Sequence, residues 1–198
     1  MEQPVTRACI FSAPSGSGKT TIVRKTMERF DCFEFSVSAT TRKKRGSEKD
    51  GIDYYFLSEQ VFKNKIDAKE FLEWEEVYPG RFYGTLHAEI SRMLDKESMP
   101  IFDVDVQGGV NLKNAFGDGA ISFFIQPPSI EVLEERLVKR GTDSPEEIQK
   151  RIAKAEHELS FAPHFDYIII NDKLEEALDR VSDIISQHTG LEPASVMS

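Results

Sequence analysis

The sequence predicts an α/β protein: a three-layer core around a central parallel sheet, interrupted by a mixed β/α insertion and by a helical hairpin. Short apolar runs typical of buried strands occur at residues 8–11, 99–109, 121–125 and 167–172. Each run is followed by a helical segment, and apolar side chains in residues 18–30 have near-helical spacing. Strand–helix alternation of this kind favours parallel strands with helices on both faces of the sheet.

Two stretches depart from this alternation. Residues 35–99 contain aromatic-rich or alternating pieces, "DYYF" and "FLEWEEVY", separated by the turn signals "KDGID" and "YPGRFYG". This pattern predicts a small, mostly antiparallel insertion. Residues 127–160 predict the helical hairpin, because Gly141 suits the end of a first helix and Ser144 suits the N-cap of a second, with Glu147 three residues later.

Length, charge and cysteine content limit the functional classes. A chain of 198 residues is long enough for one compact core and short for two. The net charge of −9 argues against a general nucleic-acid or membrane-surface binder, which needs a basic surface. Apolar runs fall far below the roughly 20 residues of a membrane span, and the N-terminus lacks a secretory pattern. Two cysteines make no disulfide framework, and we expect a cytoplasmic protein.

The first apolar run leads into a glycine-rich stretch, "SAPSGSGKTT", that is typical of phosphate binding. Residues 13–20 follow the P-loop pattern G-x-x-x-x-G-K-[ST], with Ala13 in place of the first glycine. The glycines let backbone N–H groups converge on phosphate oxygens at a helix N-terminus. Lys19 can reach the β- and γ-phosphates of a nucleotide, and the Thr20 hydroxyl can bind Mg²⁺. The predicted ATP-binding residues of this loop are Ala13, Pro14, Ser15, Gly16, Ser17, Gly18, Lys19, Thr20 and Thr21.

Two aspartates end the apolar run in "DVDVQGG". On a strand, Asp103 and Asp105 share one face, and open parallel sheets bind ligands at the carboxyl ends of their strands. One of the two is therefore expected to help hold Mg²⁺, directly or through water. These features leave the class open, since motor ATPases, GTPases and kinases all have an ATP- or GTP-binding core. The GTPase motif Asn-Lys-x-Asp is not matched by "NDKL" at residues 171–174.

The order of motifs resembles the guanylate kinase family from residue 8 to about residue 187. The stretches that carry the resemblance are "SAPSGSGKTT", "FSVSATTRKKRGSEKDGIDYYF", "FLEWEEVYPGRFYGT", "IFDVDVQGG", "LEERLVKRGTDSPEEIQKRIAKAE" and "IIIND". The resemblance implies a nucleoside monophosphate kinase that catalyses MgATP + GMP ⇌ ADP + GDP, with Mg²⁺ as cofactor. It also implies three parts: a P-loop core (1–35, 99–125 and 161–198), a GMP-binding insertion (36–98) and a lid (126–160).

The resemblance further implies which residues bind the acceptor. The implied GMP-binding residues are Ser38, Arg42, Arg45, Tyr54, Glu73, Tyr83, Thr85 and Asp105. The arginines and tyrosines would hold the GMP phosphate, since guanidinium forks suit a dianionic phosphate. Glu73 would accept from guanine N1–H and the exocyclic amine, a pair of donors that adenine lacks. Ser38 and Thr85 would hydrogen-bond the O6 side of the base, and Asp105 would also touch the guanine.

On the donor side, Arg136, Arg140 and Arg151 match lid arginines that close onto the ATP phosphates and the transferred group. Asn171 matches a residue near the adenine. Asp103 would lie nearer the metal and, together with Thr20, would help to hold it, with water between Asp103 and the ion. The catalytic residues implied in this way are Lys19, Arg42, Arg136, Arg140 and Arg151.

Two alternatives stay open at this point. One is a kinase of the same plan with another acceptor, such as a ribose bisphosphate or another nucleotide. The other is a guanylate-kinase-like scaffold module that binds phosphopeptides without catalysis. Glu73, Ser38 and Thr85 argue against a sugar acceptor, whereas Lys19, Thr20 and the lid arginines argue against the module. We expect ATP with GMP or dGMP as substrates and neither nucleic acid nor membrane as partner, and a homo-oligomer is compatible with the sequence.

Overall fold

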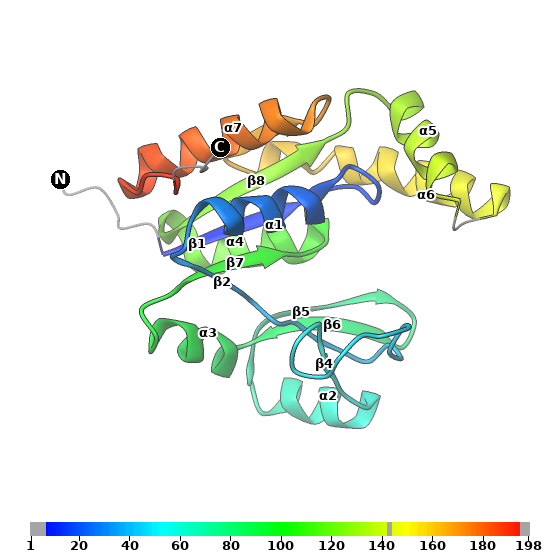
Figure 1. Ribbon diagram of the computed structural model, residues 1–198. Helices are drawn as coiled ribbons and strands as arrows, with labels where there is room; N and C mark the ends of the chain where they lie inside the picture. Colours follow the sequence, from blue (N-terminus) through cyan, green and yellow to red (C-terminus); the bar gives the residue numbers. More distant parts are fainter. Residues whose placement is uncertain (1–6, 142–143, 195–198) are drawn as a thin grey trace.

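The strands form two separate sheets in the computed structural model, which describes residues 7–141 and 144–194 apart from the Arg140 side chain (Figure 1). The larger sheet has five strands in the order β2-β7-β1-β8-β9, and every neighbouring pair is parallel. Its strands are β1 (Ala8–Ser12), β2 (Phe33–Phe35), β7 (Met99–Asp103), β8 (Ala120–Gln126) and β9 (Tyr167–Ile170). The connections from β1 to β2 and from β7 to β8 each place one helix on a face of this sheet.

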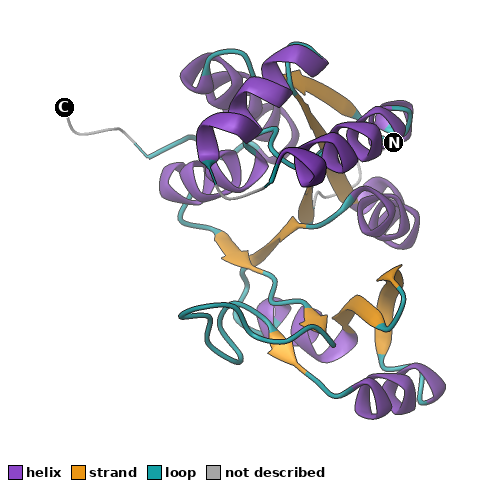
Figure 2. Cartoon of the chain, turned by 90° about the vertical axis from the view of Figure 1, so that its right-hand side faces the viewer, coloured by secondary structure: helices purple, strands orange, loops and turns teal. Residues whose placement is uncertain are grey.

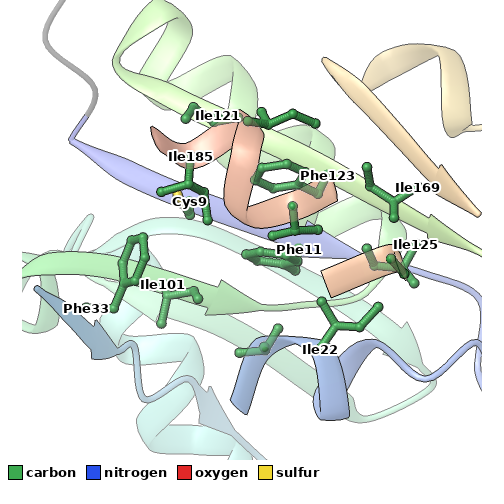
Figure 3. Packing of buried hydrophobic residues seen from close by; sticks show 14 of the residues in the cluster. Cys9, Phe11, Ile22, Phe33, Ile101, Ile121, Phe123, Ile125, Ile169 and Ile185 are labelled. Atoms are coloured by element: carbon green, nitrogen blue, oxygen red, sulfur yellow. The ribbon is translucent and has the colours of Figure 1, made fainter. Parts of the chain in front are cut away.

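Helices cover both faces of the five-stranded sheet. Helices α1 (Lys19–Arg29) and α7 (Leu174–Thr189) pack on one face, where Cys9 and Phe11 point into the main apolar cluster (Figure 3). The alternate residue Ile10 of β1 points to the opposite face and packs with Leu112 of α4 (Val106–Phe116). A strand buried on both sides reads as a continuous apolar run, as "ACIF" does. The predicted three-layer α/β core is confirmed.

The insertion has a sheet and a core of its own. Its four strands run in the order β4-β3-β6-β5, where β3–β6 and β5–β6 are antiparallel and β3–β4 is parallel. Its elements are β3 (Ala39–Thr40), β4 (Tyr55–Phe56), α2 (Glu59–Asp67), β5 (Phe71–Tyr78), β6 (Arg81–Leu86) and α3 (His87–Leu94). Phe62 of α2 packs against Phe71 and Phe82 of the sheet. Figure 2 shows this small sheet and its helices as a body beneath the larger one.

The predicted helical hairpin comprises α5 (Ile130–Arg140) and α6 (Pro145–Leu159). Gly141 ends α5 in the left-handed region at φ 67°, which favours glycine, and the Ser144 hydroxyl caps α6 by accepting from the Glu147 N–H at 3.3 Å. Buried Leu133 and Leu137 of α5 contact the apolar face of α6. Two short 3₁₀ turns, Gly117–Gly119 and Ala162–His164, precede β8 and β9.

The strand expected over residues 99–109 is shorter than the pattern suggested. β7 ends at Asp103, and Asp105 is the N-cap of α4, where its carboxylate accepts the Gly108 N–H at 2.8 Å. The apolar alternation of "DVDVQGG" continues past this point, but an aspartate at a helix start satisfies an otherwise unpaired N–H group. The two aspartates therefore do not share a strand face.

Close pairing of β5 with β6 requires glycine at position 84. A Cβ atom added to Gly84 would lie 2.8 Å from the Glu73 carbonyl oxygen and 2.9 Å from both Phe71 Cδ1 and Trp74 Cβ. Real Cβ atoms do not approach backbone this closely, so the strands would have to separate beside Glu73 and Thr85.

We expect Gly84→Ala to lower the free energy of unfolding by roughly 1–3 kcal/mol, because the added methyl group overpacks a paired strand. Gly119→Ala is the matched control, since its added Cβ meets nothing within 4 Å, and should change stability by about 0.5 kcal/mol or less. Urea unfolding followed by circular dichroism measures both. Equal midpoints for the two variants would contradict the strand-contact explanation.

Candidate active site

The P-loop joins the carboxyl end of β1 to α1 and has the backbone shape that its glycines permit. Gly16 and Gly18 have φ values of 99° and 90°, a region that other residues rarely adopt. A Cβ atom at Gly16 would lie 2.9 Å from Leu133 Cδ1, and one at Gly18 would collide with the Asn171 side chain. Both glycines are therefore required by conformation and by close packing.

The helix start after the loop is free of side-chain capping in the described residues. Gly18 is the N-cap of α1 and offers no side chain to the first N–H groups of the helix. Helix N-termini of this kind attract anions through their unpaired N–H groups and the helix dipole. The Ser17 hydroxyl in the loop is buried and, within the described part of the chain, also has no hydrogen-bond partner. The loop thus keeps donors available for phosphate oxygens.

Asp103, at the end of β7, bonds to side chains at the start of α1. Strand pairing sets it opposite Phe11 of β1, and its carboxylate forms an ion pair with Lys19 and accepts from the Thr20 hydroxyl at 2.8 Å. The Lys19 ammonium also donates to the Val104 carbonyl at 2.6 Å. A hydroxyl and a carboxylate side by side are oxygen ligands of the type that Mg²⁺ prefers.

These oxygens fit a magnesium ion that is held mostly by other ligands. Within residues 7–141 and 144–194 there is no group of three or more His, Cys, Asp or Glu side chains placed to hold a metal. Mg²⁺ in phosphoryl-transfer sites commonly uses one or two protein oxygens plus substrate phosphates and waters. The donor set at Thr20 and Asp103 meets that requirement.

A buried carboxylate lies between the insertion and the core. Glu73 of β5 is 9% exposed and accepts from the hydroxyl of Thr85, its cross-strand neighbour on β6, at 2.7 Å. Burial raises the pKa of Glu73 to about 7, with Thr85 opposing the rise and the charge of Asp105 adding to it. A Cβ built on Gly108 would lie 3.2 Å from Asp105 Oδ1 and 3.5 Å from Glu73 Oε2, so both carboxylates border the start of α4. Such a pair can accept the donor edge of a base.

The guanidinium of Arg42 lies in an aromatic and acidic setting. It donates to both carboxylate oxygens of Glu48, at 2.6 Å each, and lies 4.7 Å from the centre of the Tyr54 ring. Tyr83 meets Tyr54 edge-on with 6.1 Å between ring centres. The backbone N–H of exposed Arg45 donates to Glu48 at 2.8 Å. Hydrogen bonding to Arg42 lowers the pKa of Glu48 to about 2, so this carboxylate stays charged.

The structure therefore brings together most, but not all, of the predicted acceptor-binding side chains. Glu73, Thr85 and Asp105 form one group, and Arg42, Tyr54 and Tyr83 form another. Arg45 joins the second group through its backbone. For Ser38, the hydrogen bond described is that of its backbone carbonyl, which accepts the Tyr55 N–H at 2.9 Å.

The hairpin contributes two arginines with described contacts. Arg151 of α6 donates to the Ser15 hydroxyl of the P-loop at 2.8 Å, and Arg136 of α5 donates to the Asn171 carbonyl at 2.8 Å. Arg140 is the last residue of α5, and its side chain lies outside the described part of the structure. Two of the three predicted lid arginines thus bond to the P-loop and to the segment that follows β9.

Asn171 bonds to the backbone of the P-loop. Its side chain is buried and donates to the Ser17 carbonyl at 2.7 Å, and it is the group that excludes a side chain at Gly18. Its predicted position near an adenine stays a prediction, because the described contacts of its side chain are with the loop.

Comparison with known proteins identifies the family. The guanylate kinase family model matches residues 5–188. The chain is 52% identical over 186 residues to a guanylate kinase of Bacteroides fragilis, covering 94% of this chain and 91% of that one. It is 47% identical over 184 residues to that of Porphyromonas gingivalis, covering 92% and 98%. The crystal structure of guanylate kinase from Anaplasma phagocytophilum superposes with a TM-score of 0.74 at 29% identity, covering 98% and 92%.

The chain belongs to the guanylate kinase family. Membership gives it guanylate kinase activity, the phosphorylation of GMP by ATP, so the chain is a phosphotransferase. These matches confirm the resemblance drawn from the motifs and favour neither the sugar kinase nor the scaffold module. Among helices in the described residues, none is long and apolar enough to span a membrane.

Several residues at the site of this guanylate kinase family member were missed by sequence reasoning. Glu48 pairs with Arg42, and Lys154 of α6 lies 5.0 Å from the centre of the Tyr78 ring, which connects the hairpin to the insertion. Glu48 lies within "RKKRGSE", where a single acid after four basic residues is a usable signal. The contact between Lys154 and Tyr78 joins residues 76 positions apart, and local patterns carry no signal for it.

We expect Glu73 to reduce stability at neutral pH. Its folded-state pKa is about 7, above the ordinary 4.5, so its contribution to stability is fully present below about pH 4.5 and lost as pH rises through about 7. Glu73→Gln removes this titration. The stability of the variant relative to the original protein should increase by roughly 1–3 kcal/mol between pH 5 and pH 8.

Urea unfolding at both pH values measures this difference. Glu76→Gln is the control, because Glu76 lies on the same strand and is exposed. A stability difference between Glu73→Gln and the original protein that is the same at pH 5 and pH 8 would contradict the raised pKa.

Proposed function

We propose that this family member reads guanine with Glu73 and Thr85, grips the GMP phosphate with Arg42, and transfers the γ-phosphoryl group of MgATP held by the P-loop. The observation that carries this proposal is the buried Glu73 carboxylate, bonded to Thr85 and bordering Asp105. A buried acceptor pair suits the N1–H and exocyclic amine of guanine, which together present two donors. Adenine presents an acceptor at N1 and would leave Glu73 unpaired.

The arginine cluster supports the choice of a phosphate-bearing acceptor. Arg42 is only 9% exposed and forms an ion pair with Glu48. Its guanidinium therefore already binds one carboxylate. A dianionic phosphate offers the same fork of oxygens with more charge. Tyr54 and Tyr83 add hydroxyl donors at the same place, and burial raises the pKa of Tyr54, so its hydroxyl keeps its proton. We assign Arg45 to the same phosphate.

Phosphoryl transfer asks the protein for positioning and charge stabilisation. An oxygen of the GMP phosphate is already a nucleophile at neutral pH, so no side chain has to act as general base. P-loop N–H groups and Lys19 would bind the β- and γ-phosphates. Thr20 and Asp103 would hold the Mg²⁺ that accompanies ATP, Asp103 through water. When bound, that ion would neutralise negative charge on the phosphates of ATP.

Exclusion of water explains the three parts that we propose, a P-loop core (1–35, 99–125 and 161–198), a GMP-binding insertion (36–98) and a lid (126–160). Water inside the site would hydrolyse ATP, so the acceptor and the lid must close on the core before transfer. Arg136, Arg140 and Arg151 would then neutralise the transferred group. The bond from Arg151 to Ser15 and the approach of Lys154 to Tyr78 support a lid that reaches both the core and the insertion.

The proposal extends to dGMP as a second acceptor, Asn171 near the adenine and residence in the cytoplasm. The net charge of −9 supports the absence of nucleic-acid and membrane-surface partners. Nothing in the contacts described above requires a second copy of the chain, although a homo-oligomer remains compatible.

The first experiment offers MgATP with GMP, dGMP, AMP, UMP, dTMP and ribose 1,5-bisphosphate separately, and resolves the products by chromatography. We expect GDP from GMP and little product from AMP, with kcat/KM for GMP falling about 10²-fold or more in Glu73→Gln, because the base edge loses its charged acceptor. Glu76→Gln, an exposed position on the same strand, is the matched control and should retain activity. Phosphorylation of the sugar alone would disprove base recognition.

Arg151→Ala should lower kcat by about 10³-fold, because a lid arginine neutralises charge in the transition state. Lys150→Ala removes the neighbouring exposed cation of α6 and should stay within about twofold. Single-turnover measurement with saturating MgATP and GMP tests both. Equal losses in the two variants would indicate a general field effect rather than a specific role for Arg151.

A further inference from the structure

The chain passes from the core into the insertion through residues 36–38, and each backbone position there bonds to a different part of the protein. The Ser36 N–H donates to the Ile101 carbonyl of β7 at 3.0 Å. The Val37 N–H donates to Glu89 Oε1 on α3 at 3.0 Å. The Ser38 carbonyl accepts from Tyr55 of β4 at 2.9 Å. These three residues therefore join the core sheet, α3 and the insertion sheet.

Glu89 is the centre of this junction. It is 2% exposed, and besides the Val37 N–H it accepts the Tyr55 hydroxyl at 2.9 Å. Arg92, one turn further along α3, donates to both of its oxygens at 3.1 and 2.9 Å. Burial opposes the charged form, but the bonds from Arg92, Val37 and Tyr55 outweigh it and hold the pKa of Glu89 below its usual value. The carboxylate therefore stays ionised at neutral pH.

The same network extends to the core. Arg92 also forms an ion pair with Glu34 of β2, and Lys96 donates to Glu34 at 3.0 Å. Glu34 lies two residues before Ser36, on the strand that leads into the connection. The outgoing connection, α3, is thus bonded to the incoming connection at two points, one on each side of Ser36.

The positions of these bonds matter because two predicted base-contacting hydroxyls flank them. Ser38 follows Val37 directly, and its carbonyl is held by Tyr55, whose hydroxyl is held by Glu89. Thr85 lies four residues before Glu89, at the end of β6 from which α3 continues. One carboxylate therefore sets the separation between the segment carrying Ser38 and the segment carrying Thr85.

A buried charge with this many donors is not explained by stability alone. Moving charges out of water commonly costs as much as the ion pair gains, so such groups are weak evidence of stabilisation. They do impose geometry, because a carboxylate with four donors has few alternative arrangements. A carboxylate with several donors also occurs at an exposed position: Asp166 accepts the Ser122 N–H and hydroxyl at 2.9 and 2.8 Å and pairs with Lys113.

We propose that Glu89 is a positioning residue for guanine recognition, which holds Ser38 at a fixed distance from Thr85 and fixes the insertion to the core at its connections. The proposal rests on the proposed function, since it assumes that Ser38 and Thr85 bind the O6 side of the base. Glu89 itself does not contact the substrate. Its removal should weaken GMP binding and base selectivity while leaving the ATP side unchanged.

Steady-state kinetics of Glu89→Ala, Glu89→Gln and Tyr55→Phe test this. We expect the KM for GMP to rise about tenfold in Glu89→Ala, less in Glu89→Gln, which retains one acceptor oxygen, and about threefold in Tyr55→Phe. The KM for ATP and kcat at saturating GMP should stay within about twofold. Preference for GMP over 6-thioguanosine monophosphate, which keeps N1–H and the amine but replaces O6 by a weakly accepting sulfur, should fall in the same order.

Asp166→Asn is the matched control. It weakens another carboxylate network that joins two segments, at an exposed position before β9 and away from the P-loop, and should lower stability while leaving the KM for GMP and the base preference unchanged. If Glu89→Ala does not fold, Glu89→Gln and Tyr55→Phe decide the question, since each keeps the size of the side chain.

An unchanged KM for GMP in Glu89→Gln and Tyr55→Phe, or parallel rises in the KM of GMP and ATP, would overturn the positioning role. A failure of the proposed function is distinguishable, because the unsubstituted protein would then form no GDP from GMP. Calorimetric titration of each variant with GMP alone gives the same answer without turnover.

Discussion

Parallel pairing of β1 with β7 is the constraint on which the rest of the site depends. It places Phe11 opposite Asp103, so the loop that leaves β1 begins beside the aspartate that ends β7. Lys19 and Thr20 at the start of α1 then reach that carboxylate. Two residues later Asp105 starts α4, whose first turn carries Gly108 against Glu73 of the insertion. The proposed phosphate-binding and base-binding groups are therefore joined through the few residues that follow β7.

The site balances its cations with carboxylates of its own. Lys19 pairs with Asp103 and Arg42 with Glu48, although the chain as a whole carries a charge of −9. Buried or half-buried cations are costly without a partner. Local acids therefore hold these side chains in position until phosphates arrive with more charge. This arrangement suits the proposed binding of small anions on an acidic protein.

The groups that we propose for base recognition lie in an environment that costs stability. Glu73 is buried beside Asp105, and its raised pKa shows that this environment disfavours the charged carboxylate. Position 84 must be glycine, because a Cβ atom there would keep β5 from approaching β6. Glu89 is another buried charge, and its bonds with Val37 and Tyr55 order the junction between the insertion and the core. These groups lie between elements, whereas apolar clusters such as the one around Phe11 and Phe123 supply the stability.

The sequence by itself determined the three-layer core, the P-loop, the helical hairpin with its caps and the family. These features are carried by periodicity, by glycines and by short motifs, which depend on neighbouring residues in the chain. Tertiary structure decided the end of β7 at Asp103 and the meeting of Val37 with Glu89, 52 residues apart. Such contacts follow from how strands and helices pack, and local sequence carries no record of which buried donor a distant carboxylate will meet.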